Sequence, residues 1–325
     1  MKKMIANNGS GRSPWWRGPY RDGATFTWDL LYRCNYRCSY CWWEQKKLWG
    51  EFSKKYPPVP AQKWIDAWRR LGGRYGRARL DVLGGEPLAT PDAAGFFAEL
   101  SKHHDLVINT NLSPGRKELE TLAARCVREA VYINASFHPE FAERESFLEK
   151  MRLLKEAGFP AAVFVVSYPP LIPQLPKIRE FFSKAGIPVG VQVFQGTYRG
   201  RDYPAAFTEA EREALKTDAG LRSSEERWAY RVEERPTRGK LCCAGWFYGN
   251  VKADGEVYRC GGTGPGLETE ARVGNLFQED FELFPGPAPC PAGRCFCQEH
   301  IYLLEEQEKK CPDLVERWAS GKRAQ

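Results

Sequence analysis

Apolar runs and amphipathic segments alternate along the chain, which indicates a protein built from strands and helices in turn. Runs rich in β-branched and aromatic residues predict six buried strands, at residues 25–32, 79–83, 106–110, 130–137, 161–167 and 189–194. Helical spacing of apolar residues predicts helices at residues 61–71, 91–103, 114–127, 144–157 and 175–185. This alternation predicts an α/β fold with a parallel sheet and right-handed crossovers. Ligands of such sheets bind at the carboxyl ends of the strands.

Glycines and a turn signal mark the boundaries of two further predicted elements. Gly72-Gly73 is expected to end the first helix, since glycine is a frequent helix terminator. Residues 247–252 and 256–259 predict two strands joined by a turn at Asp254-Gly255. Because a hairpin brings its two ends together, we expect Cys242 and Cys260 to lie side by side. A last helix is expected at residues 298–318.

Composition and charge narrow the classes of function. No apolar run approaches the ~20 residues that span a bilayer, and no signal peptide follows the N-terminus. Eleven cysteines in such a chain predict metal ligands kept reduced in the cytoplasm rather than disulfides. The net charge of +7 is spread along the chain without a nucleic-acid-binding motif. We therefore expect a cytoplasmic protein with no nucleic-acid partner and no membrane partner, and an anionic substrate stays open.

Three closely spaced cysteines follow the first predicted strand. Cys34, Cys38 and Cys41 form a C-x3-C-x2-C pattern, which can hold three irons of a [4Fe–4S] cluster and leaves the fourth iron open to a small chelating molecule. A zinc site is the alternative, but zinc usually takes paired C-x2-C or mixed Cys/His ligands. The nearest downstream cysteine, Cys126, stands alone.

A second motif, Gly84-Gly85-Glu86-Pro87, directly follows the second predicted strand. The two glycines let the backbone approach a ligand closely, and Glu86 supplies an acceptor for an ammonium group. A plain strand-to-helix turn is the alternative for this motif taken alone.

The two motifs together, with Tyr40 just before the last cysteine, resemble the signature of the radical S-adenosylmethionine (SAM) superfamily. The resemblance implies a curved, incomplete (β/α)6 barrel of the TIM type over residues 25–200. It further implies that SAM fills the open iron site and that Tyr40 packs near its adenine. The SAM amino group would be held by Gly84, Gly85 and Glu86.

Polar residues at the remaining strand ends are the next candidates. The resemblance makes Asn111 and Ser136 candidates for contacts to the carboxylate or ribose of SAM, although local turn-capping explains each equally well. Ser167, and Gln192 or Gln195, should face the same cavity. His138 is a candidate general acid or base, with a loop-stabilising imidazole as the alternative.

The C-terminal cysteines resemble part of a SPASM or twitch domain, which carries an auxiliary cluster. The resemblance rests on Cys242, Gly255 and Cys260, and it implies an auxiliary-cluster domain at residues 241–325, after a charged bridge at 201–240 and following an N-terminal arm at 1–24. Further ligands could come from Cys290, Cys295 and Cys297. The full SPASM spacing is missing, which favours one auxiliary [4Fe–4S] cluster over two. Whether Cys243 replaces Cys242 is open, and Cys311 could be a further ligand or only a core thiol.

The resemblance implies an enzyme that receives one electron from an external donor such as flavodoxin or ferredoxin. Reductive cleavage of SAM would give a 5′-deoxyadenosyl radical that abstracts a hydrogen atom from a small anionic, sugar or nucleotide substrate. A peptide or protein substrate is the alternative, and a non-enzymatic iron–sulfur or zinc-binding module is the alternative from another class. Spare thiols at Cys243 and Cys126 raise the hypothesis that one of them returns a hydrogen atom to the substrate.

Overall fold

A curved sheet forms the centre of the fold. The computed structural model describes residues 23–216, 235–261, 268–295 and 301–321. Within them, the sheet has nine strands in the order β13-β12-β11-β1-β2-β3-β4-β5-β6. Its first six strands are β1 (Thr25–Leu31), β2 (Arg79–Gly84), β3 (Asp105–Thr110), β4 (Val131–Ser136), β5 (Ala161–Val166) and β6 (Val189–Gln192). These six run parallel, so the predicted α/β partial barrel is confirmed.

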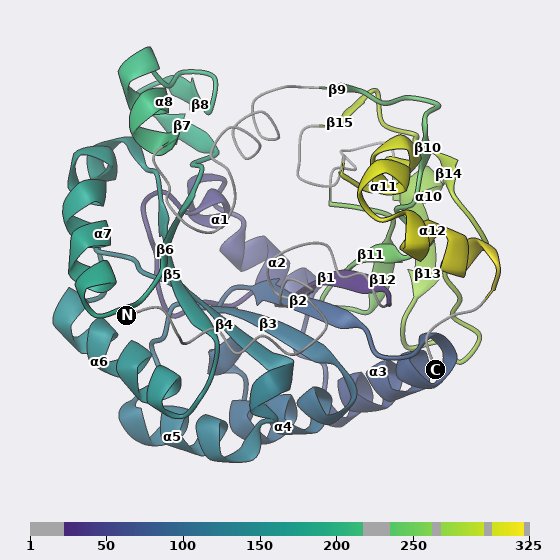
Figure 1. Cartoon of the computed structure of the whole chain (residues 1–325), viewed down its shortest axis with the longest axis horizontal. Helices are drawn as coiled ribbons and strands as arrows, with labels where there is room; N and C mark the ends of the chain where they lie inside the picture. The colour runs from purple at the N-terminus through teal and green to yellow at the C-terminus, as the bar shows by residue number, and fades with distance from the viewer. Residues whose placement is uncertain (1–22, 217–234, 262–267, 296–300, 322–325) are drawn as a thin grey trace.

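Helices α3–α7 cover the outer side of this sheet (Figure 1). Their bounds are α3 (Ala61–Tyr75), α4 (Ala93–His103), α5 (Arg116–Arg125), α6 (Arg144–Glu156) and α7 (Leu175–Lys184). Two short helices that the sequence did not reveal precede them, α1 (Trp42–Gln45) and α2 (Trp49–Lys55). Alternate residues of each strand point to the outer face of the sheet, and on β1 and β2 these residues are apolar and buried. Trp28, for example, has no exposed surface, and its ring lies 4.7 Å from Trp64 and 5.2 Å from Trp68.

The predicted C-terminal hairpin is confirmed, and it extends the main sheet. Strands β11 (Tyr248–Val251) and β12 (Glu256–Tyr258) are antiparallel, and β13 (Arg272–Asn275) follows them. The new feature is the parallel pairing of β11 with β1, in which Thr25 pairs with Tyr248 and Thr27 with Asn250. Strands on both sides of residue 241, the predicted start of the C-terminal domain, therefore belong to one sheet.

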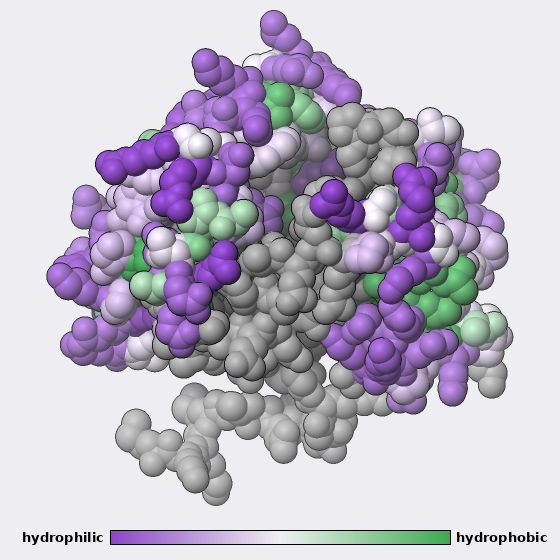
Figure 2. Space-filling view, turned by 90° about the horizontal axis from the view of Figure 1, so that it is seen from above, coloured by the Kyte–Doolittle hydropathy of each residue, from purple (hydrophilic) through white to green (hydrophobic). Residues whose placement is uncertain are grey.

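Smaller elements complete the described chain. They are β7 (Gly196–Tyr198), β8 (Arg201–Tyr203), α8 (Glu209–Lys216), β9 (Arg235–Pro236), β10 (Leu241–Cys242), α10 (Glu268–Ala271), β14 (Ala288–Pro289), β15 (Arg294–Cys295), α11 (Leu304–Lys310) and α12 (Pro312–Ala319). Three two-stranded sheets pair β7 with β8, β9 with β15, and β10 with β14. Seen from above, the described surface is mostly hydrophilic (Figure 2). No helix in the described ranges has the length and apolar character needed to cross a membrane.

Two predicted helix boundaries are wrong. Helix α3 runs through Gly72 and Gly73 and ends at Tyr75, and the next residue, Gly76, has a positive φ of 77° that glycine adopts easily. Gly72 instead allows close packing, since a Cβ there would lie 3.1 Å from the buried ring of His104. The single helix expected at 298–318 is two helices within the described residues, because Pro312 interrupts the chain between α11 and α12.

Candidate functional site

The cysteine loop begins in direct backbone contact with the glycine pair after β2. The N–H of Gly85 donates to the carbonyl of Leu31 (2.8 Å), and the N–H of Glu86 donates to the carbonyl of Arg33 (2.9 Å). A Cβ at Gly85 would lie 2.8 Å from the amide nitrogen of Cys34 and closer still to the Arg33 carbonyl. The sequence suggested a close approach to a ligand. In the structure the two glycines admit the chain that leads into the cysteine loop.

Glu86 is a buried carboxylate that joins the ends of β2 and β3. Its side chain accepts hydrogen bonds from the N–H of Leu88 (2.9 Å), the hydroxyl of Thr110 (2.6 Å) and the N–H of Asn111 (2.6 Å). Burial raises the pKa of Glu86 to about 7, although these hydrogen bonds oppose the rise. A carboxylate offers about four lone-pair sites, which is more than these three hydrogen bonds use. The predicted binding of an ammonium group by Glu86 stays a prediction.

Asn111 connects β3 to the first cysteine. Its side-chain amide donates to Asn35 (3.0 Å) and lies 3.9 Å from the sulfur of Cys34, while its carbonyl oxygen accepts the N–H of Ser113. The side chain is 5% exposed. Asn111 therefore contacts the cysteine loop and caps a turn, and its predicted contact with SAM stays a prediction.

The loop after β4 holds the middle of the cysteine loop. Glu140 accepts the backbone N–H of Ser39 at 2.8 Å and the hydroxyl of Ser39 at 2.5 Å. The hydroxyl of Tyr40 lies 2.9 Å from Nδ1 of His138, and the ring of Tyr36 stacks on Phe141 at 4.8 Å. Sequence reasoning missed Glu140, because an exposed glutamate in a loop carries no motif.

Tyr40 and His138 are both enclosed by other rings. Tyr40 is 4% exposed, and its ring centroid lies 5.1 Å from that of Tyr168. Burial lowers the pKa of His138 to about 4, against the opposing influence of Glu140. The imidazole is therefore neutral near pH 7 and contacts the Tyr40 hydroxyl. Its predicted acid–base role is not tested by this geometry.

A third support reaches the end of the cysteine loop from the β6–β7 side. Cys41 is the residue at the start of α1, and its N–H donates to the carbonyl of Cys38 (2.9 Å). Gln45, the last residue of α1, donates to the carbonyls of Ser39 (3.2 Å) and Thr197 (3.1 Å). Different strand ends therefore hold the beginning, middle and end of the loop.

The three thiols fit the ligands of an iron–sulfur cluster. Burial raises the pKa values of Cys34, Cys38 and Cys41, that of Cys38 to about 12, and the thiols also influence one another electrostatically. Backbone hydrogen bonds oppose this rise in pKa. The sulfur of Cys34 accepts one from the N–H of Tyr36, and Cys41 accepts others at the start of α1. In the described part of the chain no three Cys, His, Asp or Glu side chains gather closely enough to bind one metal ion. A four-iron cluster needs a wider spacing, since each thiolate binds a different iron.

The two predicted serines occupy different environments. Ser136 ends β4 and is half-buried, on the same sheet face as Asn134. Ser167 has no exposed surface, and its hydroxyl accepts the N–H of Phe194 (3.0 Å). Ser167 therefore joins the ends of β5 and β6, and contacts from either serine to SAM stay predictions. Gln192 and Gln195 are exposed.

The inner face of the sheet carries polar side chains beside a small apolar cluster of Val107, Tyr132 and Ala162. Sequence reasoning did not reveal the polar part. Lys252 donates to Asp29 (2.9 Å) across the β1–β11 pairing, and these side chains are 27% and 15% exposed. On β2, Arg79 pairs with Asp81 at 2.7 Å. Asn109 donates to the carbonyl of Val82. Alternation of polar residues along these strands was the available signal.

Arginine and cysteine side chains organise the C-terminal segment. The buried guanidinium of Arg259 donates to the carbonyls of Ala244 (2.9 Å) and Ala288 (2.7 Å) and reaches that of Cys242 (3.4 Å). Cys290 and Cys295 both influence the pKa of Cys242, which burial raises to about 11. Cys260 directly follows Arg259 in the chain. Cys242, Cys290 and Cys295 therefore lie in one region, and Cys297 lies outside the described residues.

Three other cysteines are buried in the core. Cys243 has no exposed surface, and its N–H donates to the carbonyl of Tyr302 (2.7 Å). Cys311, 4% exposed, belongs to the hydrophobic core, which agrees with the core-thiol alternative. Cys126 follows α5 and precedes β4, so it lies at the amino edge of the parallel strands, away from the cysteine loop.

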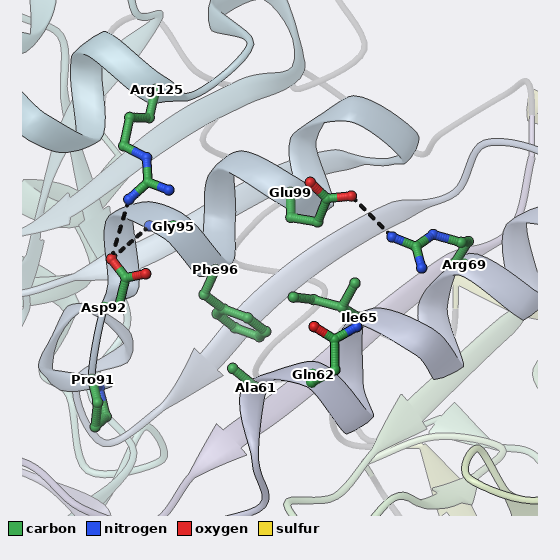
Figure 3. A pocket seen from close by; sticks show the side chains of 10 residues that line it. All are labelled: Ala61, Gln62, Ile65, Arg69, Pro91, Asp92, Gly95, Phe96, Glu99 and Arg125. Atoms are coloured by element: carbon green, nitrogen blue, oxygen red, sulfur yellow. Dashed lines mark hydrogen bonds and ion pairs between the residues drawn. The ribbon is translucent and has the colours of Figure 1, made fainter.

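A pocket of about 460 Å³ opens between α3 and α4 on the outer helical layer (Figure 3). Its charged residues pair with one another, Arg69 with Glu99 (3.0 Å) and Arg125 with Asp92 (3.3 Å). None of the predicted site residues lines it.

Comparisons with known proteins find similarity to one segment of the sequence and to the fold. A GTP 3′,8-cyclase from Cyanothece sp. is 36% identical over 86 residues, which are 26% of this chain and 26% of the cyclase. The fold is similar to SuiB of Streptococcus suis (TM-score 0.54, 13% identity, 80% of this chain and 64% of SuiB). It is also similar to anSMEcpe, solved with AdoMet and the Cp18Cys peptide (TM-score 0.54, 12% identity, 90% of this chain and 99% of that one).

The likeness to SuiB and anSMEcpe shows the fold alone, and the chain spans only about a quarter of the cyclase. The family model described as the radical SAM superfamily matches residues 29–185, which contain the three cysteines and the Gly84–Pro87 motif. Residues 29–185 of this chain are therefore a radical SAM superfamily domain.

Proposed function

We propose that this protein is a radical SAM enzyme. The observation that carries the proposal is the support of one three-cysteine loop by the ends of β2, β3 and β4 and, through Gln45, by β7. Cys34, Cys38 and Cys41 would hold a [4Fe–4S] cluster with one iron left for SAM. When bound, the cluster and SAM together would supply a 5′-deoxyadenosyl radical that abstracts a hydrogen atom from the substrate.

The chain's own residues bind and orient the reactants. Glu86 binds the backbone of Asn111, and the Asn111 side chain binds Asn35 next to the first cysteine. Tyr40 of the loop contacts His138. Such preorganised surroundings hold reacting groups in place and exclude water. The neutral His138 can accept a hydrogen bond from Tyr40 and so fix the orientation of that ring.

An auxiliary [4Fe–4S] cluster near the C-terminus is a further part of the proposal. Cys242, Cys290 and Cys295 supply thiols in one region, and Cys260 and Cys297 are further candidates from the sequence. The buried Arg259 supports this proposal because it ties the segment containing Cys242 to β14. Its positive charge also favours thiolates nearby.

For the substrate we propose a small, polar molecule of the nucleotide or sugar class, bound against the inner face of the sheet. The Asp29–Lys252 and Arg79–Asp81 pairs give this face charges of both signs. The segmental identity with a GTP cyclase supports this class. A peptide is the second candidate, favoured by the likeness to SuiB, which has been solved with its precursor peptide SuiA.

Anaerobic reconstitution with iron and sulfide, followed by incubation with SAM and dithionite, tests the proposal. We expect about eight irons per chain if both clusters form, and release of 5′-deoxyadenosine. Cys34→Ala should abolish that release, whereas the matched Cys126→Ala change at the opposite edge should retain it. An intact cluster that releases no 5′-deoxyadenosine would contradict the proposal. Stimulation of release by nucleotides or by peptides then chooses between the substrate classes.

A further inference from the structure

The turn between the second and third cysteines docks on a four-residue segment after β4. Cys38–Cys41 is a tight turn closed by the hydrogen bond from the Cys41 N–H to the Cys38 carbonyl (2.9 Å). Its two central residues are Ser39 and Tyr40. Each of them contacts the segment at residues 138–141, Ser39 through Glu140 and Tyr40 through His138.

Glu140 makes a two-point contact with Ser39. Both of its carboxylate oxygens are engaged, one by the Ser39 N–H (2.8 Å) and one by the Ser39 hydroxyl (2.5 Å). Hydrogen bonds to an ionised acceptor are roughly twice as strong as neutral ones, and a two-point contact also fixes orientation. A ring stack of Tyr36 on Phe141, with 4.8 Å between the centroids, joins the neighbouring part of the loop to the same segment.

The position of this carboxylate bears directly on two of the three thiols. The bonded amide of Ser39 immediately follows Cys38, and the turn that contains it delivers Cys41 to the start of α1. The charge of Glu140 also acts on the Cys38 thiol, whose thiolate it disfavours. Glu140 therefore has both a geometric and an electrostatic connection to this part of the loop.

We propose that Glu140 is a positioning residue for the iron–sulfur cluster, which fixes the Cys38–Cys41 turn through Ser39 and lowers the reduction potential of the cluster through its negative charge. This inference rests on the proposed function. A reduced cluster carries one more negative charge than an oxidised one, so a nearby carboxylate disfavours reduction. A purely structural contact would change stability without changing the potential.

Three variants separate the two effects. Glu140→Gln removes the charge and keeps the size of the side chain. Ser39→Ala removes the hydroxyl donor but leaves the charge of Glu140 in place. Glu143→Gln is the matched control, because Glu143 is an exposed carboxylate three residues further on whose side chain makes no capping hydrogen bond to α6.

The measurements are the midpoint potential of the reconstituted cluster and the rate of iron release to a chelator, each on the full chain. We expect Glu140→Gln to shift the potential to a more positive value than Glu143→Gln does. Iron release should be roughly threefold to tenfold faster in both Glu140→Gln and Ser39→Ala. Thermal melting of each apoprotein verifies that the variants fold. If Glu140→Gln fails to fold, iron release from Ser39→Ala alone decides whether the contact positions the Cys38–Cys41 turn.

Two results would overturn the inference in distinguishable ways. If the wild-type protein holds a cluster but Glu140→Gln matches Glu143→Gln in potential, and Ser39→Ala matches wild type in iron release, Glu140 has no positioning role while the proposed function stands. If the wild-type protein assembles no four-iron cluster, the proposed function and the role of Glu140 fail together.

Discussion

Replacing Gly85 with alanine tests the contact on which the cysteine loop rests. The added methyl group would lie 2.8 Å from the Cys34 amide nitrogen and nearer to the Arg33 carbonyl. Both obstructing groups are backbone, so no side-chain rotation can relieve the overlap. The loop must move away from the end of β2, and the hydrogen bonds that Gly85 and Glu86 donate to Leu31 and Arg33 must lengthen or break.

The expected loss follows from these contacts. Two backbone hydrogen bonds contribute about 1 kcal/mol each, and overpacking in a close-packed region costs about 1–3 kcal/mol more. Gly85→Ala should therefore lower the free energy of unfolding by about 3–5 kcal/mol, a large part of the ~5–15 kcal/mol typical of a domain. Iron retention should fall with it, because Cys34 is displaced.

Urea unfolding of the apoprotein, followed by tryptophan fluorescence, measures the change. Gly73→Ala is the control, since Gly73 lies in α3 with nothing within 4 Å of an added Cβ. An alanine there should stabilise the protein by about 0.5–1 kcal/mol. If Gly85→Ala came within about 0.5 kcal/mol of wild type and kept its iron, the reasoning about this contact would be refuted.

Three further predictions concern buried charges. Burial raises the pKa of Glu86 from 4.5 to about 7, so the stability due to its proton is present below pH 4.5 and lost as the pH rises through about 7. Urea unfolding should show the wild type losing stability relative to Glu86→Gln over this pH range. Parallel stability curves for the two proteins would contradict this. Arg259→Lys cannot reach the carbonyls of Ala244, Ala288 and Cys242 together; it should lower the melting temperature and the iron bound by the C-terminal cysteines, and an unchanged iron content would disprove the role of Arg259. Asp29→Asn removes the charge opposite Lys252 and should cost about 1–3 kcal/mol in urea unfolding, whereas an unchanged midpoint would show that solvent replaces the pair.

Local patterns predicted the main part of the fold. The six parallel strands were found because each is a short apolar run bounded by turn residues, and the Asp254-Gly255 turn revealed the C-terminal hairpin. Local signals misled where packing decided the outcome. Glycine at position 72 predicts a helix stop, but in the structure Gly72 allows the close packing of α3 on His104.

The contacts around the site were harder to predict. The three cysteines and the Gly84–Pro87 motif carry recognisable spacing, and the matching family model confirms that their segment is a radical SAM domain. Glu140 reaches Ser39 of the cysteine loop across 101 positions of sequence, and Gln45 joins that loop to Thr197 across 152 positions. Nothing local to either residue specifies such a partner, because long-range pairing depends on the completed sheet.

The parallel pairing of β11 with β1 has a consequence for how the protein is made. Strand β1 carries the cysteine loop, and its second neighbour comes from residues 248–251, more than two hundred positions later. Until the ribosome has delivered that segment, β1 is an uncovered edge with a row of unpaired amides and carbonyls, the kind of surface that recruits other chains. A fragment cut after residue 216 should therefore aggregate, and a chaperone that shields nascent β1 should raise the yield of the full-length protein.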